Sequence, residues 1–230
     1  MRPPRARLAG IAALLVLAAC AAPAASPTPR TSCPTQAPTA ATAAGIIGDT
    51  VAIEVRTNKG SFTIELEPES APIAVANFVG LAHCGFYDGI SFHRVIADFV
   101  AQAGDPQTKT NHGAFDGLGT GGAGYQFEIE LPPETTVYRH YMVAMANAMQ
   151  YDFATGEIQG GTDTNGSQFF VMLDDVDSLR PFYSVLGTVV AGTDVVDAMG
   201  QLPTSGDPFN VPLDPVIIES MVDTSVPQAS

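Results

Sequence analysis

The chain has 230 residues, 46% of them hydrophobic, and a formal net charge of −14 at pH 7 from 24 acidic and 10 basic side chains. The length predicts one domain with an appendage, and the apolar content is sufficient for a buried core. The acidic balance argues against nucleic acid as a partner, because phosphate contacts need clustered Lys and Arg.

The first nineteen residues have the pattern of an export signal. Arg2, Arg5 and Arg7 precede an apolar run at Leu8–Ala19, which is too short to span a membrane comfortably. Removal of these arginines leaves 7 basic against 24 acidic side chains, a net charge of −17.

The apolar run ends in Leu-Ala-Ala-Cys at residues 17–20, which looks like a bacterial lipobox. We therefore expect residues 1–19 to be a lipoprotein signal peptide and Cys20 to carry the lipid. The lipid would anchor the exported chain to the outer face of the cell membrane, or to the periplasmic side of an envelope membrane. The alternative is an ordinary secretory signal that is cleaved nearby, with Cys20 incidental.

Residues 20–48 are rich in Ala, Pro, Thr and Ser and carry almost no charge. Such a segment buries too little apolar surface to order itself, so we predict a disordered tether between the membrane and the domain. The domain is expected at residues 49–224, and residues 225–230 are assigned to a C-terminal tail.

With Cys20 lipidated, Cys33 and Cys84 remain as a pair in an oxidising compartment. Two alternatives stay open: a disulfide that pins the tether to the domain, and two free thiols. The sequence has no Cys-x-x-Cys spacing, so it supports neither a zinc knuckle nor a redox motif. We expect no metal and no cofactor.

The domain opens with the alternation typical of a β-hairpin. Apolar and polar residues alternate at residues 51–56 and 62–66, and Asn58-Lys59-Gly60 supplies the turn between them. A helix is predicted next at about Ala71–His83, with Ser70 as its N-cap.

Further short strands are predicted along the rest of the domain, at residues 92–96, 99–102, 127–130, 141–146, 167–172, 183–190 and 216–221. A second helix is predicted at about Thr193–Met199. Many short strands with two helices favour a closed β-barrel.

The stretch Phe92–Asp105 reads as two of these strands, joined by a turn at Ala97–Asp98, and it places Arg94 among apolar residues. A guanidinium in such surroundings must find acceptors or lie at a wet edge, because burying an unpaired charge is costly. On this stretch alone, Arg94 is either an edge-strand arginine in a structural ion pair or a functional group.

Four motifs follow one another: Phe-His-Arg-Val-Ile at 92–96, Gln-Ala-Gly-Asp at 102–105, Met-Ala-Asn-Ala at 145–148 and Thr-Asn-Gly-Ser-Gln-Phe-Phe at 164–170. In this order they resemble the cyclophilin family of peptidyl-prolyl cis–trans isomerases. The resemblance covers about residues 50–222. It implies an all-β dominated fold, a closed eight-stranded antiparallel β-barrel capped by two helices, and isomerisation of Xaa-Pro bonds in exported proteins.

The resemblance also implies the site. Arg94 matches the catalytic arginine, and Gln102 matches the glutamine that positions this arginine and the substrate carbonyl. The backbone of Ala146 and Asn147 would pair with the residue before the proline. The wall of the proline pocket is matched by Phe99, Val100, Phe170, Leu179 and Tyr183. The neighbouring subsite is matched by Gly119 and Gln168.

The chain departs from the usual family pattern at several of these positions. Val100 stands where a methionine is usual, Tyr183 where many members have histidine, and Ser178 where many have tryptophan. The last change removes an indole donor and an aromatic surface, since the chain has no Trp. About a dozen extra residues within Met149–Asp163 lengthen the loop before Thr164, so we expect a different substrate range.

The alternative is that the chain has the cyclophilin fold but little catalytic activity. It would then be a module that binds Pro-containing segments as a chaperone or scaffold. In either case the expected partners are Pro-containing polypeptides and the membrane, and the chain is expected to be monomeric. Gly117–Gly122 matches Gly-x-Gly-x-x-Gly, but no helix or Walker lysine follows, so a nucleotide site is not predicted. His93 reads as a structural residue of the first motif.

Overall fold

The computed structural model describes residues 30–152 and 154–225. The predicted signal peptide, the lipidation site Cys20, the first part of the tether and residues 226–230 of the tail lie outside the described residues. None of the helices in the described part is long and apolar enough to cross a membrane.

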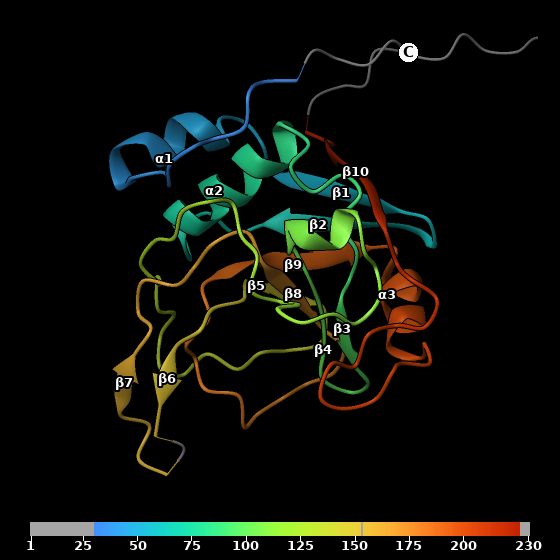
Figure 1. The fold of residues 1–230 in the computed structure, drawn as a ribbon. Coiled ribbons are helices and arrows are strands. Elements are labelled where there is room, and N and C mark those ends of the chain that lie inside the picture. The colour runs from blue at the N-terminus through green and yellow to red at the C-terminus, as the bar shows by residue number, and fades with distance from the viewer. Residues whose placement is uncertain (1–29, 153, 226–230) are drawn as a thin grey trace, which may run out of the picture.

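One eight-stranded antiparallel sheet forms the body of the domain (Figure 1). Its order is β10-β1-β2-β9-β5-β8-β4-β3. The strands are β1 (Ala52–Thr57), β2 (Gly60–Leu66), β3 (Arg94–Ile96), β4 (Val100–Ala103), β5 (Met142–Met145), β8 (Phe169–Met172), β9 (Val185–Ala191) and β10 (Ile218–Asp223).

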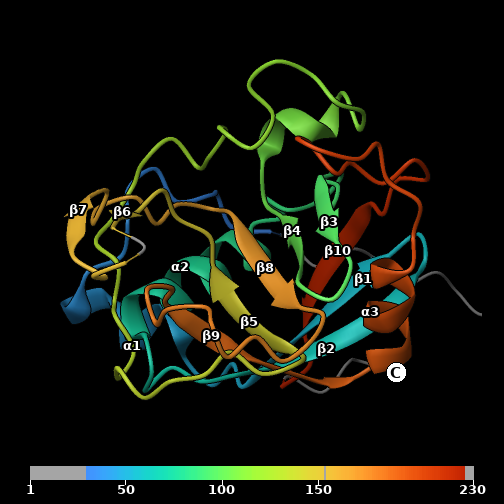
Figure 2. The same ribbon diagram turned by 90° about the horizontal axis from the view of Figure 1, so that it is seen from below.

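The prediction of a closed barrel is wrong. The sheet is a curled half-barrel (Figure 2), and it stays open because its end strands β3 and β10 do not pair with each other. Only an isolated bridge, Ser91–Ile217, and a few loop hydrogen bonds cross this seam. The chain beside β3 contains Pro212 and Pro215, which have no N–H to donate, so a continuous ladder cannot form there.

The strand predicted at residues 127–130 is also wrong. In the structure this segment is irregular and makes one isolated bridge, between Phe127 and Asn165. Its role is instead to cap a helix. Both carboxylate oxygens of Glu130 accept hydrogen bonds from the first turn of α2 (Pro72–His83), at the N–H groups of Ile73 and Ala74. Glu130 therefore supplies the acceptor that the sequence had assigned to Ser70.

Helix α2 closes one opening of the curled sheet, and α3 (Thr193–Gly200) packs against β2, β3 and β4 (Figure 1). Eight of the twelve residues of α2 are buried. The main core joins α2 to the inner face of the sheet through aromatic contacts. The ring of Phe169 on β8 meets the rings of Phe78, Tyr87 and Phe92 at centroid distances of 5.3, 5.5 and 6.0 Å.

The predicted disordered tether differs from the structure over its second half. Residues 40–47 form helix α1 (Ala40–Ile47), which packs along α2 on the outside of the domain (Figure 1). Ala43 and Ile47 are buried in this contact, and they belong to the main hydrophobic core. Composition alone suggested no packing surface, but helical spacing places these apolar side chains on one face, against α2.

Of the two alternatives for the cysteines, the structure has the disulfide, between Cys33 and Cys84 at the end of α2. An ion pair between Arg30 and Asp88 lies close by. The disulfide, this ion pair and α1 together fasten residues 30–48 to the domain, and we call this segment the N-terminal strap.

We predict that loss of the disulfide destabilises the protein by about 2–4 kcal/mol, because the cross-link restricts the unfolded chain across a separation of 51 residues. The measurement is urea unfolding of the wild type with and without a reductant. A variant carrying Cys33→Ser and Cys84→Ser should have the unfolding midpoint of the reduced wild type, and the reductant should not change that midpoint. Equal unfolding midpoints in all samples would contradict the prediction.

Candidate functional site

The strand register places a row of side chains on the outer face of the sheet. Arg94 on β3 lies opposite Gln102 on β4, Gln102 lies opposite Phe170 on β8, and Phe170 lies opposite Ala144 on β5. Directly opposed residues of antiparallel strands share one face. The row therefore joins the arginine to an apolar surface that belongs to neither α2 nor the main core.

That apolar surface is a second hydrophobic cluster, separate from the main core. Its buried members are Val100, Tyr138, Ala144, Phe170, Met172 and Val185, and Phe99, Met142, Ala146, Val176, Leu179 and Tyr183 pack against it half-buried. The rings of Phe170 and Tyr183 meet at a right angle, with centroids 5.2 Å apart. All five residues predicted to form the pocket wall are in this cluster, and we use the name apolar notch for the surface that these five residues form.

The guanidinium of Arg94 lies at the edge of the apolar notch. Its central carbon is 5.9 Å from the ring centroid of Phe99. Burial lowers the pKa of Arg94 from its ordinary value, while Tyr183 and Asp207 oppose the shift. No described residue forms an ion pair or a side-chain hydrogen bond with this guanidinium. Its N–H groups are therefore available to an acceptor that enters the notch.

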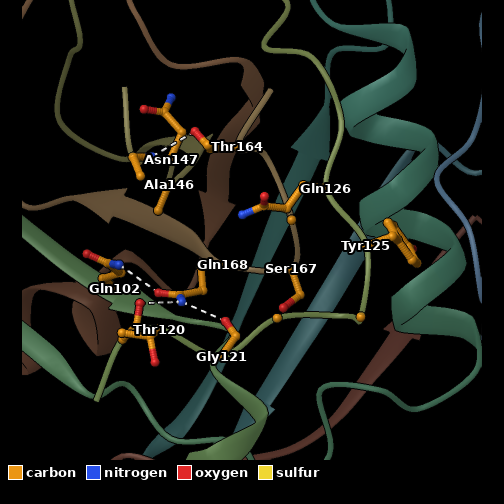
Figure 3. A pocket seen from close by; sticks show the side chains of 15 residues that line it. Gln102, Thr120, Gly121, Tyr125, Gln126, Ala146, Asn147, Thr164, Ser167 and Gln168 are labelled. Atoms are coloured by element: carbon orange, nitrogen blue, oxygen red, sulfur yellow. Dashed lines mark hydrogen bonds between the residues drawn. The ribbon is translucent and has the colours of Figure 1, made fainter. Parts of the chain in front are cut away.

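Two glutamines connect the notch to a neighbouring pocket. The amide of Gln102 donates to Gln168 Oε1 at 2.9 Å, and the amide of Gln168 donates to the carbonyl oxygens of Gly119 and Gly121, both at 2.8 Å (Figure 3). This chain of bonds fixes the orientation of Gln102 and holds the Gly-rich loop against β8.

The neighbouring pocket has a volume of about 610 Å³, and both glutamines line it (Figure 3). Five of the predicted site residues line it, namely Gln102, Gly119, Ala146, Asn147 and Gln168. Sequence reasoning missed most of its wall, including Thr120, Gln126 and Thr164. These residues come from loops, where no periodicity indicates which side chains face inward.

Asn147 lies between the pocket and the notch. Its side chain donates to the carbonyl of Phe182 at 2.9 Å and accepts from the N–H of Met149 at 3.1 Å. Within the described chain, no residue hydrogen-bonds to the main-chain N–H or C=O of Asn147. These two groups can therefore pair with an extended ligand strand.

The notch has a buried support that the sequence did not reveal. Tyr138 is fully buried, and its hydroxyl donates to the carbonyl of Tyr183 at 2.8 Å and accepts from the N–H of Tyr183 at 2.9 Å. It thereby fixes the backbone of a residue in the notch wall. Nothing in the local pattern around Tyr138 could have shown this, because the two residues are 45 positions apart.

The Gly-rich loop is anchored by a buried carboxylate. Asp105 accepts from the N–H of Gln107 at 2.8 Å and from the N–H of Gly119 at 2.7 Å. The segment that resembles a nucleotide loop is thus a wall of the pocket. Within residues 30–152 and 154–225, no group of three or more His, Cys, Asp or Glu is arranged to hold a metal ion.

The comparison with known protein families agrees with this arrangement. The family model described as "Cyclophilin type peptidyl-prolyl cis-trans isomerase/CLD" matches residues 51–223. The chain belongs to the cyclophilin family. Relatives of this cyclophilin are named peptidyl-prolyl cis–trans isomerases, and the chain is an enzyme of that class.

Three bacterial relatives illustrate the similarity. Peptidyl-prolyl cis–trans isomerase A of Mycobacterium tuberculosis is 36% identical over 189 residues, covering 75% of this chain and 91% of that protein. The isomerase of Helicobacter pylori is 38% identical over 173 residues, covering 74% and 85%. Isomerase B of Streptomyces anulatus is 38% identical over 185 residues, covering 73% and 93%.

Solved structures support the same family. A cyclophilin-type isomerase of Cryptosporidium parvum aligns with a TM-score of 0.63 at 30% identity, over 77% of this chain and 99% of that chain. A second structure of that protein, obtained in the presence of the dipeptide Ala-Pro, aligns with a TM-score of 0.61 over 75% and 98%.

His93, directly before Arg94, makes the stability of this cyclophilin sensitive to pH. Burial lowers the pKa of His93 to about 4; the Asp105 carboxylate opposes the shift, and the Arg94 charge adds to it. In the unfolded chain the pKa is near the ordinary value of about 6.5. Between these values the unfolded state binds more protons than the folded state, so stability falls as the pH falls through this window.

We predict that the free energy of unfolding is constant just above pH 6.5 and drops by about 3 kcal/mol between pH 6.5 and pH 4. The carboxylates with lowered pKa, such as Asp223, lose their contribution only at lower pH. Urea unfolding at several pH values measures the slope, and His93→Asn should remove most of it. An unchanged slope in the variant would assign the effect to other groups.

Proposed function

We propose that this cyclophilin accelerates rotation about Xaa-Pro bonds in exported proteins, as a folding catalyst held at a membrane surface. The observation that carries the proposal is the position of Arg94, at the edge of an apolar notch and with no acceptor among the described residues. The relative crystallised in the presence of Ala-Pro supports Pro-containing segments as the substrate.

The proposed mechanism follows from the electronic structure of the prolyl bond. Amide resonance gives a rotation barrier of about 18–20 kcal/mol, and uncatalysed turnover takes tens to hundreds of seconds. When the bond twists, the prolyl nitrogen becomes pyramidal and gains a lone pair. A donor aimed at this nitrogen binds the twisted state better than either planar state, which is the condition for catalysis.

In this mechanism the proline ring enters the notch formed by Phe99, Val100, Phe170, Leu179 and Tyr183. Arg94 then donates to the prolyl nitrogen. Gln102, fixed by Gln168, contacts the carbonyl that rotates. The main chain of Ala146 and Asn147 pairs with the residue before the proline, and the pocket at Gly119 and Gln168 takes a residue farther toward the N-terminus of the substrate. The step requires no nucleophile and no proton transfer.

The size of the arginine effect can be bounded. A hydrogen bond to a charged group contributes about 1.5–3 kcal/mol net, and each tenfold in rate needs about 1.4 kcal/mol. Arg94 alone thus accounts for roughly tenfold to hundredfold. Preorganisation of the notch, in which Tyr138 and Gln168 hold their neighbours by hydrogen bonds, supplies the remainder.

The location of the enzyme is part of the proposal. The arginines and apolar run at residues 2–19, followed by Leu-Ala-Ala-Cys, support export and lipidation of Cys20. The Cys33–Cys84 disulfide supports an oxidising compartment, because cytosolic thiols are kept reduced. The N-terminal strap would leave residues 20–29 as the link between the lipid and the domain.

We predict that Arg94→Ala lowers kcat/KM for a short Xaa-Pro peptide by tenfold to hundredfold or more, since the variant lacks the guanidinium donor beside Phe99. Magnetisation-exchange NMR on the cis and trans peptide signals measures the rate. Arg56→Ala, on β1, is the matched control and should keep wild-type activity, because Arg56 is paired with Glu54 and belongs neither to the notch nor to the pocket lining. If the wild type and Arg94→Ala both equal buffer, the chain is a binding module rather than a catalyst.

We predict that the mature protein begins at Cys20 with an acylated N-terminus. Intact-mass and peptide mass spectrometry of the protein purified from membranes tests this, with Cys20→Ser as the control that should lack the mass of the acyl chains. A free, unacylated N-terminus downstream of Cys20 would exclude the lipid anchor and leave the isomerase proposal intact.

A further inference from the structure

The residues inserted before Thr164 form a second, two-stranded sheet, β6 (Gln150–Tyr151) and β7 (Ile158–Gly160), beside the main sheet (Figure 1). The base of this hairpin is fastened to the substrate groove. The N–H of Ala148 donates to Thr164 Oγ1 at 2.9 Å, and that hydroxyl donates to the carbonyl of Gly161 at 2.5 Å. Gly161 has φ +74°, and a Cβ there would lie 2.3 Å from the carbonyl oxygen of Ala148, so the closure requires glycine.

The hairpin also packs on the segment that forms the outer rim of the notch. The ring of Tyr151 meets the ring of Phe182 with centroids 4.9 Å apart and planes inclined at 72°. The side chain of Arg180 lies against Gly156, where a Cβ would come within 2.4 Å of Nη1. The hairpin is therefore a built part of the rim and not a loose loop.

Asn147 joins the hairpin and the rim at the point where substrate would pair. Its side-chain amide donates to the carbonyl of Phe182, and its side-chain oxygen accepts from Met149 at the start of the inserted segment. A ligand residue paired with the main chain of Asn147 would therefore lie next to the segment of Phe182, whose ring contacts Tyr151. The pocket at Gly119 and Gln168 lies on the other side.

The aromatic surface continues from the notch to the hairpin. Phe170 packs on Tyr183, Phe182 precedes Tyr183 in the chain, and Tyr151 packs on Phe182. Burial raises the pKa of Tyr183, and the Tyr151 hydroxyl adds to this shift, which agrees with the two rings being near each other. Ser178, where many cyclophilins have tryptophan, is exposed and small.

We propose that Tyr151 and Phe182 form an additional subsite, which favours a bulky apolar or aromatic side chain on the residue directly before the proline. The inference rests on the proposed function for the position of the substrate at Asn147. Aromatic edges and faces bind such side chains by area burial and ring contacts, whereas glycine or serine at this position offers little to bury. Tyr151 is then a specificity-determining residue, and it takes no part in the rotation itself.

The test compares short peptides that differ only before the proline, with Leu, Phe, Ser or Gly at that position. We expect the wild type to favour Leu-Pro and Phe-Pro over Gly-Pro by about threefold to tenfold in kcat/KM. Tyr151→Ala should reduce this preference to within twofold while leaving kcat/KM for Gly-Pro unchanged. The Gly-Pro rate thereby also shows that the variant folds.

Two further variants separate a subsite from a structural effect. Tyr151→Phe keeps the ring and should keep the preference. Gln159→Ala changes an exposed residue on β7 of the same hairpin and should behave as wild type. The proposal is overturned if Tyr151→Ala retains the preference, if it slows Gly-Pro and Leu-Pro by the same factor, or if Gln159→Ala acts like Tyr151→Ala.

Failure of the proposed function would look different, since the wild type would then accelerate none of the peptides. In that case the dissociation constants of the same four peptides, measured by NMR titration with wild type and Tyr151→Ala, decide the subsite. A threefold or larger affinity preference that Tyr151→Ala abolishes supports it, and equal affinities refute it.

Discussion

The site depends on the half-buried guanidinium of Arg94, for which residues 30–152 and 154–225 provide no side-chain acceptor. A cation in partly apolar surroundings normally gains an ion pair, because desolvation is costly. Here the register of three strands places Arg94 in line with Gln102 and Phe170, while the ring of Phe99 lies beside the charge. Burial lowers the pKa of Arg94, yet an arginine remains charged at any physiological pH. The strand register thus holds the Arg94 donor at the notch. On a more flexible segment, the same side chain could turn toward solvent or a carboxylate.

The same strands build the core and the site on their two faces. On β8, Phe169 faces inward to the rings of Phe78, Tyr87 and Phe92, whereas Phe170 faces outward into the notch. Alternation along a strand enforces this division. The inner cluster supplies the apolar burial that holds β8 in place, whereas the outer cluster has Phe99, Leu179 and Tyr183 half-buried at its edge. Tyr138 supports the outer face through its two hydrogen bonds to the backbone of Tyr183.

Two additions distinguish this cyclophilin domain, and they lie at different places. The N-terminal strap covers α2 and is locked by the Cys33–Cys84 disulfide, on the side of the domain where α1 lies in Figure 1. The β6–β7 hairpin instead borders the groove, tied to Asn147 and Phe182. The two additions are anchored at different residues, the strap at Cys84, Asp88 and α2 and the hairpin at Asn147 and Phe182.

The sequence by itself determined the family, the positions of α2 and α3, most strands of the main sheet, and the residues that meet around Arg94. The helices and strands follow from period-3.6 and period-2 patterns, whereas the family and the site residues follow from the motifs that resemble cyclophilins. Only the tertiary structure decided that the sheet stays open beside β3, that residues 40–47 fold onto α2, that Tyr138 supports the notch from behind, and that Tyr151 packs on Phe182 at its rim. Each of these depends on contacts between residues far apart in the chain, such as Cys33 with Cys84 or Glu130 with Ile73, and no local pattern encodes such contacts.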